Sequence, residues 1–316
     1  MTRRATIVGA GAAVLAVSAP GAVARACDGR AVQGALVHGA PVCVPRQPRR
    51  VATLDPYYNL QMALSLGLPV VASARSGGSL PDAVLVGHAD WVAEGFVDLG
   101  QFQYPDLEAL LVARPDLILG DATMHASLAG VLSEIAPTVL VQAIDWRDYL
   151  AVIAEAGGAE ARAAEALGAY DGRLAAVRAG VPAGTSVSFV RVVPGGFQVY
   201  VDGPAAYAPM RILAEAGLAR PPFETVADDT VLRRLGWEGL LQLEGDWLIV
   251  TVGGGHHASD GRDLMAETMA HPLWQAIPAV AAGRVRVVDP GPWMGFGGLH
   301  SALAVLDDID AMFAAR

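Results

Sequence analysis

Short apolar runs alternate with segments of helical periodicity along most of the chain. In the first half, the apolar runs are bounded by turn residues and predict strands, and the segments between them predict helices. Strands that are apolar on both faces predict a parallel sheet covered by helices on both sides. A short extended segment at 31–48 predicts a preceding hairpin. The predicted strands are 50–54, 69–72, 97–99, 117–119 and 138–141, and the predicted helices are 57–66, 106–113 and 123–135.

The middle of the chain interrupts this alternation with a long helical stretch. A helix predicted over 148–156 ends at Gly157-Gly158, and the Ala-rich segment 159–178 that follows contains no proline. Its larger apolar residues recur at helical spacing with charges between them, which predicts one helix of about five turns. These apolar positions are Leu167, Tyr170, Leu174 and Val177.

The second half returns to alternating strands and helices, without a sequence repeat of the first half. The whole pattern predicts an α/β fold with two parallel-sheet lobes joined by a single long helix. The expected boundaries are an N-terminal lobe at 27–158, a linking helix at 159–180 and a C-terminal lobe at 181–316. The predicted strands here are 187–192, 198–201, 247–252 and 285–288, and the predicted helices are 207–216, 237–241 and 299–313.

Residues 1–26 have the organisation of a signal peptide. The positively charged Arg3-Arg4 precedes an apolar run over 5–23, and Ala24-Arg25-Ala26 has the small-residue pattern of a cleavage site. A membrane anchor is the alternative, but Pro20-Gly21 interrupts a run that would be marginal against the roughly 20 apolar residues of a spanning helix. We therefore expect cleavage after Ala26 and a periplasmic-type, extracytoplasmic location, with Sec and Tat export both open.

The chain has two cysteines, Cys27 and Cys43, and both lie near the predicted mature N-terminus. Nearby cysteines in an oxidising compartment usually pair, which predicts a Cys27–Cys43 disulfide. Closing a loop of this size stabilises a fold by about 3 kcal/mol in the chain-entropy description. The alternative is a lipid anchor on Cys27, although Ala24-Arg25 does not match the residues that a lipoprotein signal prefers.

Composition and charge exclude several classes of function. The net charge is −10 at pH 7, and so acidic a chain is not expected to bind nucleic acid, which requires basic patches. All 22 basic residues are arginine, so the chain has neither a Schiff-base lysine nor a P-loop lysine. It also contains no G-x-S-x-G nucleophile motif, and no G-x-G-x-x-G follows a predicted strand. We therefore predict a binding protein and not an enzyme.

One group of residues could bind a metal ion directly. His256-His257 are adjacent and lie close to Asp260, and these side chains could bind Zn²⁺ or Mn²⁺. Neighbouring histidines on a loop, however, seldom chelate one ion together, and the other histidines are scattered along the chain. A direct metal site is therefore an alternative hypothesis and not the favoured one.

Aromatic and arginine side chains near the ends of predicted strands point to a ligand cleft. Ligands of parallel sheets bind beyond the carboxyl ends of the strands. Aromatic rings there provide rigid apolar walls, and arginines neutralise carboxylates, so together they predict a bulky, partly aromatic, anionic ligand. For each residue alone, packing explains the position equally well. The candidate ligand-binding residues are Tyr57, Tyr58, Trp146, Arg191, Arg211 and Trp293.

Three stretches, in this order along the chain, resemble one family of transport proteins. They are Val51-Ala52-Thr53-Leu54-Asp55, then Pro105-Asp106-Leu107-Glu108 with Arg114-Pro115-Asp116-Leu117-Ile118, and finally His271-Pro272-Leu273-Trp274 with Ala282-Gly283-Arg284-Val285. On these motifs the chain resembles the ferric-siderophore-binding proteins of ABC importers, a group with cobalamin- and haem-binding relatives. The resemblance covers nearly the whole mature chain.

The resemblance implies a fold and a partner. The fold would be two lobes joined by a rigid helix, with a shallow cleft that closes only slightly. The partner would be the permease of an ABC transporter, onto which one glutamate from each lobe docks. By motif position these are Glu108 and Glu238, the latter in Trp237-Glu238-Gly239-Leu240. The helix dipole favours acids in the first turn of a helix and explains both glutamates without a partner, so this alternative stays open.

The resemblance also bears on the ligand. Arg191 matches an arginine common in the iron-citrate-like branch, and the spacing of Cys27 and Cys43 is similar to that branch as well. Gln101-Phe102-Gln103 stands where hydroxamate-siderophore binders often carry an arginine, which disfavours that ligand class.

The resulting hypothesis is an extracytoplasmic, monomeric solute-binding protein for iron uptake that captures a ferric siderophore or an iron-citrate-like chelate. The iron would arrive inside its chelator, so the protein would need no cofactor and no metal ligand of its own. One alternative is a haem or cobalamin binder of the same fold, in which Tyr207, His125 or His257 would be an axial ligand of haem. The other is the direct Zn²⁺ or Mn²⁺ binder.

Overall fold

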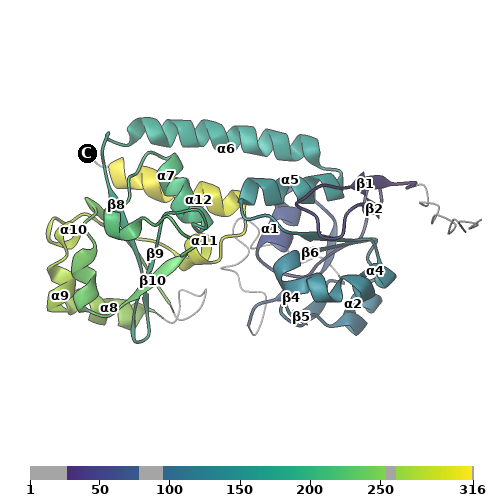
Figure 1. Ribbon diagram of the computed structural model, residues 1–316, viewed down its shortest axis with the longest axis horizontal. Helices are drawn as coiled ribbons and strands as arrows, with labels where there is room; N and C mark the ends of the chain where they lie inside the picture. Colours follow the sequence, from purple (N-terminus) through teal and green to yellow (C-terminus); the bar gives the residue numbers. More distant parts are fainter. Residues whose placement is uncertain (1–26, 78–94, 254–260, 315–316) are drawn as a thin grey trace, which may run out of the picture.

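The computed structural model of the protein describes residues 27–77, 95–253 and 261–314 and contains two α/β lobes beneath one long helix (Figure 1). That helix, α6 (Glu160–Gly180), runs over both lobes and corresponds to the helix predicted at 159–178. The predicted signal peptide, residues 1–26, lies outside the described residues. Within the described ranges, the helices are too short or too polar to cross a bilayer.

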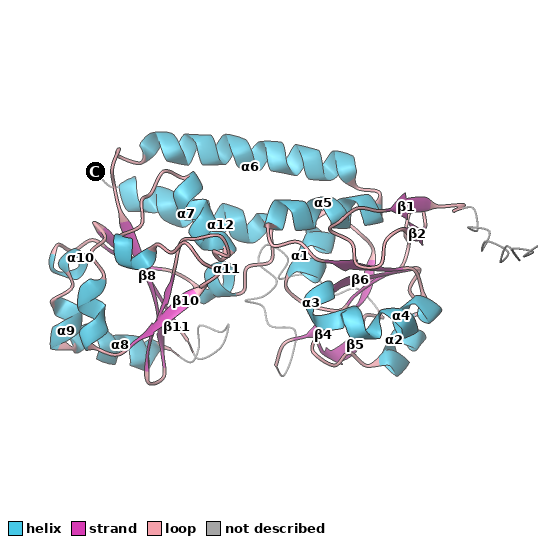
Figure 2. Ribbon diagram, viewed as in Figure 1, coloured by secondary structure: helices cyan, strands magenta, loops and turns pink. Residues whose placement is uncertain are grey.

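The N-terminal lobe is built on a five-stranded sheet with helices on both faces (Figure 2). Its strands are β3 (Val51–Thr53), β4 (Val70–Arg75), β5 (Val97–Gln101), β6 (Leu117–Asp121) and β7 (Thr138–Val141), and its helices are α1 (Tyr58–Ser65), α2 (Leu107–Ala113), α3 (Ala122–His125), α4 (Ala129–Ile135) and α5 (Trp146–Gly157). The strand order is β5-β4-β3-β6-β7, and every neighbouring pair is parallel. This sheet confirms the prediction made from the short apolar runs.

The helix predicted over 123–135 is divided into α3, a 3-10 turn (η2, Ala126–Leu128) and α4. His125 adopts non-helical dihedral angles at this point, with φ −113° and ψ 0°. Its ring is buried, and Nδ1 accepts a hydrogen bond from the backbone N–H of Asp121 at 3.2 Å. Nε2 lies 2.8 Å from the backbone carbonyl oxygen of Phe102. These contacts tie the segment to the end of β6 and interrupt the regular helix.

A small hairpin precedes the sheet, as predicted for 31–48. Strand β1 (Arg30–Val32) pairs antiparallel with β2 (Val42–Val44). The Cys27–Cys43 disulfide is present, with the two Cα atoms 5.6 Å apart. It fastens the beginning of the described chain to β2, whose last residue is buried in the core of the lobe.

The C-terminal lobe has a mixed sheet, so the prediction of a wholly parallel second sheet is wrong. Its strands are β8 (Val187–Val193), β9 (Gly196–Tyr200), β10 (Leu232–Leu235), β11 (Trp247–Val252) and β12 (Val285–Val287), in the order β10-β9-β8-β11-β12. Strands β8, β11 and β12 are parallel, whereas β9 is antiparallel to both β8 and β10. Pro194-Gly195 joins β8 to β9, with Gly195 at φ 84°. So short a turn leaves no room for the crossover that a parallel pair requires.

The helical segments of this lobe flank the mixed sheet. They are α7 (Ala208–Glu215), α8 (Arg262–Ala270), α9 (Pro272–Gln275), α10 (Pro278–Ala281), α11 (Pro290–Met294), α12 (Leu299–Phe313) and the 3-10 turns η3 (Pro222–Glu224) and η4 (Glu238–Gln242). The helix predicted at 299–313 forms over the same residues as α12. The helix predicted at 237–241 is the 3-10 turn η4, and β10 is a strand that was not predicted from the sequence.

One apolar core continues beneath α6 from one lobe into the other. Its members include Leu60, Trp146, Phe189, Leu213 and Leu306, which come from α1, α5, β8, α7 and α12. Smaller cores fill the outer half of each lobe. Arg147 of α5 adds a two-point ion pair with Glu215 of α7, with N–O distances of 3.0 and 2.9 Å. The shared core and this ion pair hold the lobes in the arrangement that forms the cavity described next.

Candidate ligand-binding site

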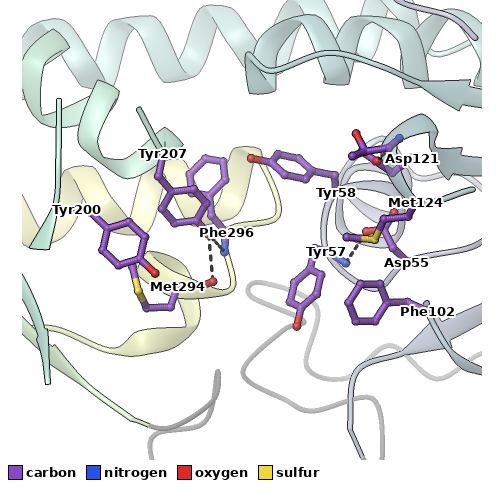
Figure 3. Close-up of a pocket in the computed structure, with 11 residues that line it drawn as sticks. Asp55, Tyr57, Tyr58, Phe102, Asp121, Met124, Tyr200, Tyr207, Met294 and Phe296 are labelled. Carbon is purple, nitrogen blue, oxygen red and sulfur yellow. Dashed lines mark hydrogen bonds between the residues drawn. The ribbon is translucent and has the colours of Figure 1, made fainter. Parts of the chain in front are cut away.

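A cavity of about 420 Å³ lies between the two lobes (Figure 3). This volume is within the range of small-molecule sites in proteins. The N-terminal lobe contributes residues at or just beyond the carboxyl ends of the parallel strands β3, β5 and β6, which is where α/β folds bind ligands. The lining residues are Asp55, Tyr57, Tyr58, Phe102, Asp121, Thr123 and Met124 from the N-terminal lobe, and Tyr200, Tyr207, Met294 and Phe296 from the C-terminal lobe.

The N-terminal wall is made of aromatic rings held by their neighbours. The hydroxyl of Tyr57 donates a hydrogen bond to Ser76 Oγ at 2.9 Å, and its ring meets Phe102 edge to face, with centroids 5.7 Å apart. Tyr58 stacks on Tyr149 of α5, with centroids 4.9 Å apart and ring planes inclined by 25°. Two candidate residues from the sequence, Tyr57 and Tyr58, therefore lie on the cavity wall.

The C-terminal wall depends on the loop that follows α11. The hydroxyl of Tyr207 donates to the carbonyl oxygen of Met294 at 3.0 Å and accepts from the backbone N–H of Phe296 at 3.2 Å (Figure 3). A Cβ on Gly297 would lie 2.0 Å from the end of the Gln61 side chain in α1, so the loop approaches this helix closely and a larger residue would have to displace that side chain. The loop thus carries the Phe296 ring to within 6.2 Å, between centroids, of Tyr58 in the other lobe.

Two carboxylates, Asp55 and Asp121, line this largely aromatic cavity. Asp55 is buried; Oδ1 accepts a hydrogen bond from the backbone N–H of Tyr57 at 2.9 Å, and Oδ2 accepts one from Asn59 Nδ2. Burial raises the pKa of Asp55, the hydrogen bond from Asn59 opposes this rise, and the nearby carboxylate of Asp121 adds to it. Asp121 also caps α3, since its Oδ1 accepts a hydrogen bond from the backbone N–H of Thr123 at 2.8 Å.

Asp55→Asn is expected to raise the free energy of unfolding at pH 7. Because the pKa of Asp55 is higher in the folded chain than in the unfolded chain, its contribution to stability is fully present below the unfolded pKa and is lost as the pH rises through the folded pKa. Asparagine removes this titration and can still accept from Tyr57. The gain should shrink as the pH falls toward 4, which urea unfolding at both pH values measures.

Asp106→Asn is the matched control for this variant. Asp106 is an exposed N-cap of α2, whose Oδ1 accepts from the backbone N–H groups of Glu108 and Ala109 at 2.9 and 3.0 Å. Asparagine caps helices about as well as aspartate, so this control should leave the free energy of unfolding nearly unchanged. A lower unfolding free energy for Asp55→Asn at pH 7 would contradict the prediction and show that the hydrogen bonds to the carboxylate outweigh its burial.

The structure corrects the prediction that Trp146 and Trp293 form walls of the cleft. Trp146 is 1% exposed and packs edge-on against Tyr170 of α6, with centroids 5.2 Å apart. Trp293 is 0% exposed, stacks on Phe189 at 5.3 Å and donates from Nε1 to Asp308 at 2.9 Å. Trp146 is the first residue of α5 and Trp293 lies within α11, and both rings are directed toward the apolar core, so neither belongs to the lining.

The two predicted arginines also lie outside the cavity lining. Arg191 is 9% exposed in β8, where its backbone pairs with Gln198 on one side and Thr251 on the other. Arg211 of α7 lowers the pKa of the cavity residue Tyr58, but its guanidinium donates to the carbonyl oxygens of Ala206 and Pro204 at 3.0 and 2.6 Å. The residues that do line the cavity therefore differ in charge from those that the sequence suggested.

Several lining residues were missed from the sequence. Asp55 and Asp121 stand at or just beyond the carboxyl ends of predicted strands, and that position is the signal that could have identified them. Tyr200 ends a strand in the same way, whereas Met294 and Phe296 belong to a loop whose course no local pattern indicates. Tyr207 was considered only as a haem ligand.

Of the residues considered for haem or metal binding, His125 and Tyr207 have properties that disfavour this role, and the others lie outside the described ranges. Both ring nitrogens of His125 have backbone partners, and burial raises the pKa of Tyr207 well above its ordinary value, which disfavours the phenolate that binds haem iron. His257, His256 and Asp260 lie outside the described residues. In the part of the chain that is described, no group of three or more His, Cys, Asp or Glu side chains could hold a metal ion.

The two glutamates predicted to dock on a permease are both exposed, and they lie on different lobes. Glu108 is in the first turn of α2, directly after the N-cap Asp106 and Leu107. Glu238 is the first residue of η4. Both positions are compatible with docking and also with the favourable effect of a helix dipole on an acid.

Comparisons with known proteins agree with this architecture. Residues 66–292 match the family described as periplasmic binding protein. The chain is 25% identical to "Probable siderophore-binding lipoprotein YfiY" of Bacillus subtilis (strain 168), covering 85% of this chain and 84% of the relative. It is 26% identical to the Fe(3+) dicitrate-binding periplasmic protein FecB of Escherichia coli (strain K12), covering 68% and 69%.

A solved structure shows the same fold. The crystal structure of Staphylococcus aureus SirA complexed with staphyloferrin B matches with a TM-score of 0.70, over 85% of this chain and 94% of that chain, at 22% identity. The family match to residues 66–292 covers more than half of the chain. The protein therefore belongs to the periplasmic binding protein family.

Proposed function

We propose that this protein captures a ferric siderophore or similar iron chelate outside the cytoplasm and delivers it to an ABC importer. It acts as a monomer that binds and releases its ligand without catalysis. The observation that carries the proposal is the aromatic cavity at the junction of the two lobes in a member of this family. The names of two relatives, one siderophore-binding and one Fe(3+) dicitrate-binding, support an iron chelate as the ligand class.

The chemistry of the cavity suits a ligand that arrives with its metal already enclosed. Six aromatic rings and two methionine side chains provide flat, apolar surfaces for contact with a large organic chelator. In a ferric siderophore, the chelator itself supplies the iron ligands. The protein therefore recognises the outer surface of the chelator, and its side chains need not reach the iron.

Delivery requires a surface that the permease recognises. We assign this role to Glu108 and Glu238, because one exposed carboxylate on each lobe lets the permease contact both lobes at once. An arginine on the permease would pair with each of them. The predicted signal peptide and the Cys27–Cys43 disulfide fit a protein that works in an oxidising, extracytoplasmic compartment.

Ligand binding is tested by titrating the intrinsic tryptophan fluorescence with ferric citrate, ferric hydroxamate and catecholate siderophores, haem, cobalamin and free Zn²⁺. We expect saturable quenching by at least one ferric chelate, and a weaker response to its iron-free form. Trp146 and Trp293 report on binding because Trp146 packs against the cavity residue Phe296, and Trp293 immediately precedes the cavity residue Met294.

A pair of variants assigns the signal to the cavity. Phe102→Ala removes a ring from the wall and should weaken binding of the chelate by about tenfold, the loss typical of a well-packed contact residue. Tyr104→Ala is the control, since Tyr104 is two residues away, 86% exposed and outside the cavity lining. A response only to haem or cobalamin would contradict the proposed ligand, and a response only to free Zn²⁺ would favour a direct metal site.

A further inference from the structure

The charge of the cavity wall narrows the class of chelate. The described residues that line the cavity include two aspartates, Asp55 and Asp121, and no arginine, lysine or histidine. The remaining lining is six aromatic rings, two methionines and one threonine. The formal charge of this wall is therefore negative, although the sequence alone had suggested an anionic ligand held by arginines.

The sequence limits the positive charge that segments outside the cavity lining can bring to the cavity. The chain has no lysine, and neither 78–94 nor 254–260, the two internal segments outside the described residues, contains an arginine. Together these segments contain three histidines and four acidic residues. Among the described residues, Arg191 is 9% exposed within β8 and is not part of the lining. Arg211 lowers the pKa of the cavity residue Tyr58, and two of its donors already bind the carbonyl oxygens of Pro204 and Ala206.

The charged groups around the cavity shift the pKa of the Tyr58 hydroxyl, which lies on the cavity wall. Burial is the largest cause that raises the pKa of this phenol. The carboxylates of Asp55, Asp145 and Asp121 raise the pKa further, and Arg211 lowers it by less than any one of them raises it. Burial and the neighbouring acidic groups thus raise the pKa of this phenol, and Arg211 opposes them.

Aromatic faces and carboxylates favour the same kind of ligand. The face of an aromatic ring carries partial negative charge and attracts ammonium and similar cations. In a cavity of low polarity, the electrostatic attraction between a cation and the Asp121 carboxylate is stronger than in water. A carboxylate on the ligand would instead lose its hydration and be repelled by the negatively charged aspartates. A polyanionic chelate would meet both penalties in this cavity.

We infer that the cavity selects ferric chelates whose outer surface is positively charged or neutral, with an ammonium-bearing chelate bound most tightly, and that it discriminates against polycarboxylate chelates. This inference rests on the proposed function and refines it. Asp121 makes the main electrostatic contact with the cationic group, and the tyrosine and phenylalanine rings surround that group and the apolar part of the chelator.

The test uses three ferric trihydroxamates that share one chelate core and differ at one end. Ferrioxamine B has a free ammonium group there, its N-acetyl derivative is uncharged, and its N-succinyl derivative ends in a carboxylate. The dissociation constants, measured by fluorescence quenching at low ionic strength, should increase in that order. We expect about tenfold or more between the ammonium and carboxylate forms. Ferric citrate should bind more weakly than the N-acetyl form.

Asp121→Asn removes the negative charge of the Asp121 carboxylate from the cavity wall. Asparagine has nearly the same shape and also caps a helix, so α3 should be retained. The variant should lose about tenfold of the preference for ferrioxamine B over the N-acetyl derivative. A circular dichroism spectrum that matches the original protein shows that the variant is folded. Asp106→Asn, at an N-cap outside the cavity, should change none of these constants.

The outcomes separate the inference from the proposed function. Equal or tighter binding of the N-succinyl derivative or of ferric citrate overturns the inference, and so does binding of a catecholate chelate when ferrioxamine B does not bind. Each of these results leaves the proposed function intact, because a ferric chelate still binds. An unchanged ratio between ferrioxamine B and its N-acetyl form in Asp121→Asn overturns the role of that carboxylate. If every ferric chelate fails while haem, cobalamin or free Zn²⁺ binds, the proposed function itself is overturned.

Discussion

Glu224→Ala is expected to lower the free energy of unfolding by about 3–5 kcal/mol, the typical cost of removing one partner of a buried ion pair. The side chains of Arg220 and Glu224 are 1% and 0% exposed and form such a pair in the C-terminal lobe. Glu224 also accepts a hydrogen bond from the backbone N–H of Phe189 at 3.1 Å, and Arg220 donates to the carbonyl oxygen of Tyr200 at 2.8 Å. The substitution would leave a buried guanidinium without its counter-charge.

Urea unfolding at pH 7 measures this effect, and two further variants make the result specific. Asp307→Ala breaks a surface pair with Arg173, in which Asp307 is 68% exposed, and should change the unfolding free energy by less than about 1 kcal/mol. Replacing both buried partners, as in Arg220→Met with Glu224→Leu, should restore much of the loss, because no unpaired charge remains. A loss below about 1 kcal/mol for Glu224→Ala would show that water reaches Arg220.

Reversing the charges of Glu108 and Glu238, the proposed docking residues, is expected to reduce uptake by at least about tenfold without changing affinity for the chelate. Charged contacts at an interface control association and exclude mismatched partners, and under the proposed docking two reversed charges would meet arginines of the permease as like charges. Glu108→Arg with Glu238→Arg is the variant, since both side chains are exposed and outside the cavity lining. The measurements are chelate-dependent iron uptake in cells that lack the native gene, and fluorescence titration of the purified variant.

The control for this experiment reverses two exposed glutamates at other places on the surface. Glu134 of α4 and Glu165 of α6 are both exposed, and Glu134→Arg with Glu165→Arg changes the net charge by the same amount. Uptake should then stay near the original level. Normal uptake by the Glu108→Arg, Glu238→Arg variant would contradict docking and leave the helix dipole as the reason for these acids.

Local patterns were sufficient for most elements of the fold. The apolar runs near 51–53, 70–75 and 117–121 became buried parallel strands, because a short run that is apolar on both faces can be buried only inside a covered sheet. The long helix followed from Ala-rich composition and helical spacing over 159–178. The antiparallel strand β9 was mistaken for part of a parallel sheet, although the turn at Pro194-Gly195 offered a signal for a hairpin.

The cavity could be predicted only in part. Tyr57 and Tyr58 were identified because they directly follow a strand at the edge where ligands bind in parallel sheets. Trp146 and Trp293 satisfied the same rule and are nevertheless buried, since the direction of a side chain after a strand depends on the helix that begins there. Phe296 escaped prediction because a loop carries it across to the other lobe, through contacts with Tyr207 and Gln61.

By itself, the sequence determined the α/β class, the linking helix, the pairing of Cys27 with Cys43 and the strand ends that border the cavity. Those features depend on periodicity, composition and residue type within short stretches. Only the tertiary structure decided which side chains face the cavity and what charge the wall carries. Asp55, Asp121 and Tyr207 meet there because elements far apart in the chain converge, and burial, which depends on that convergence, then sets the chemistry of each group.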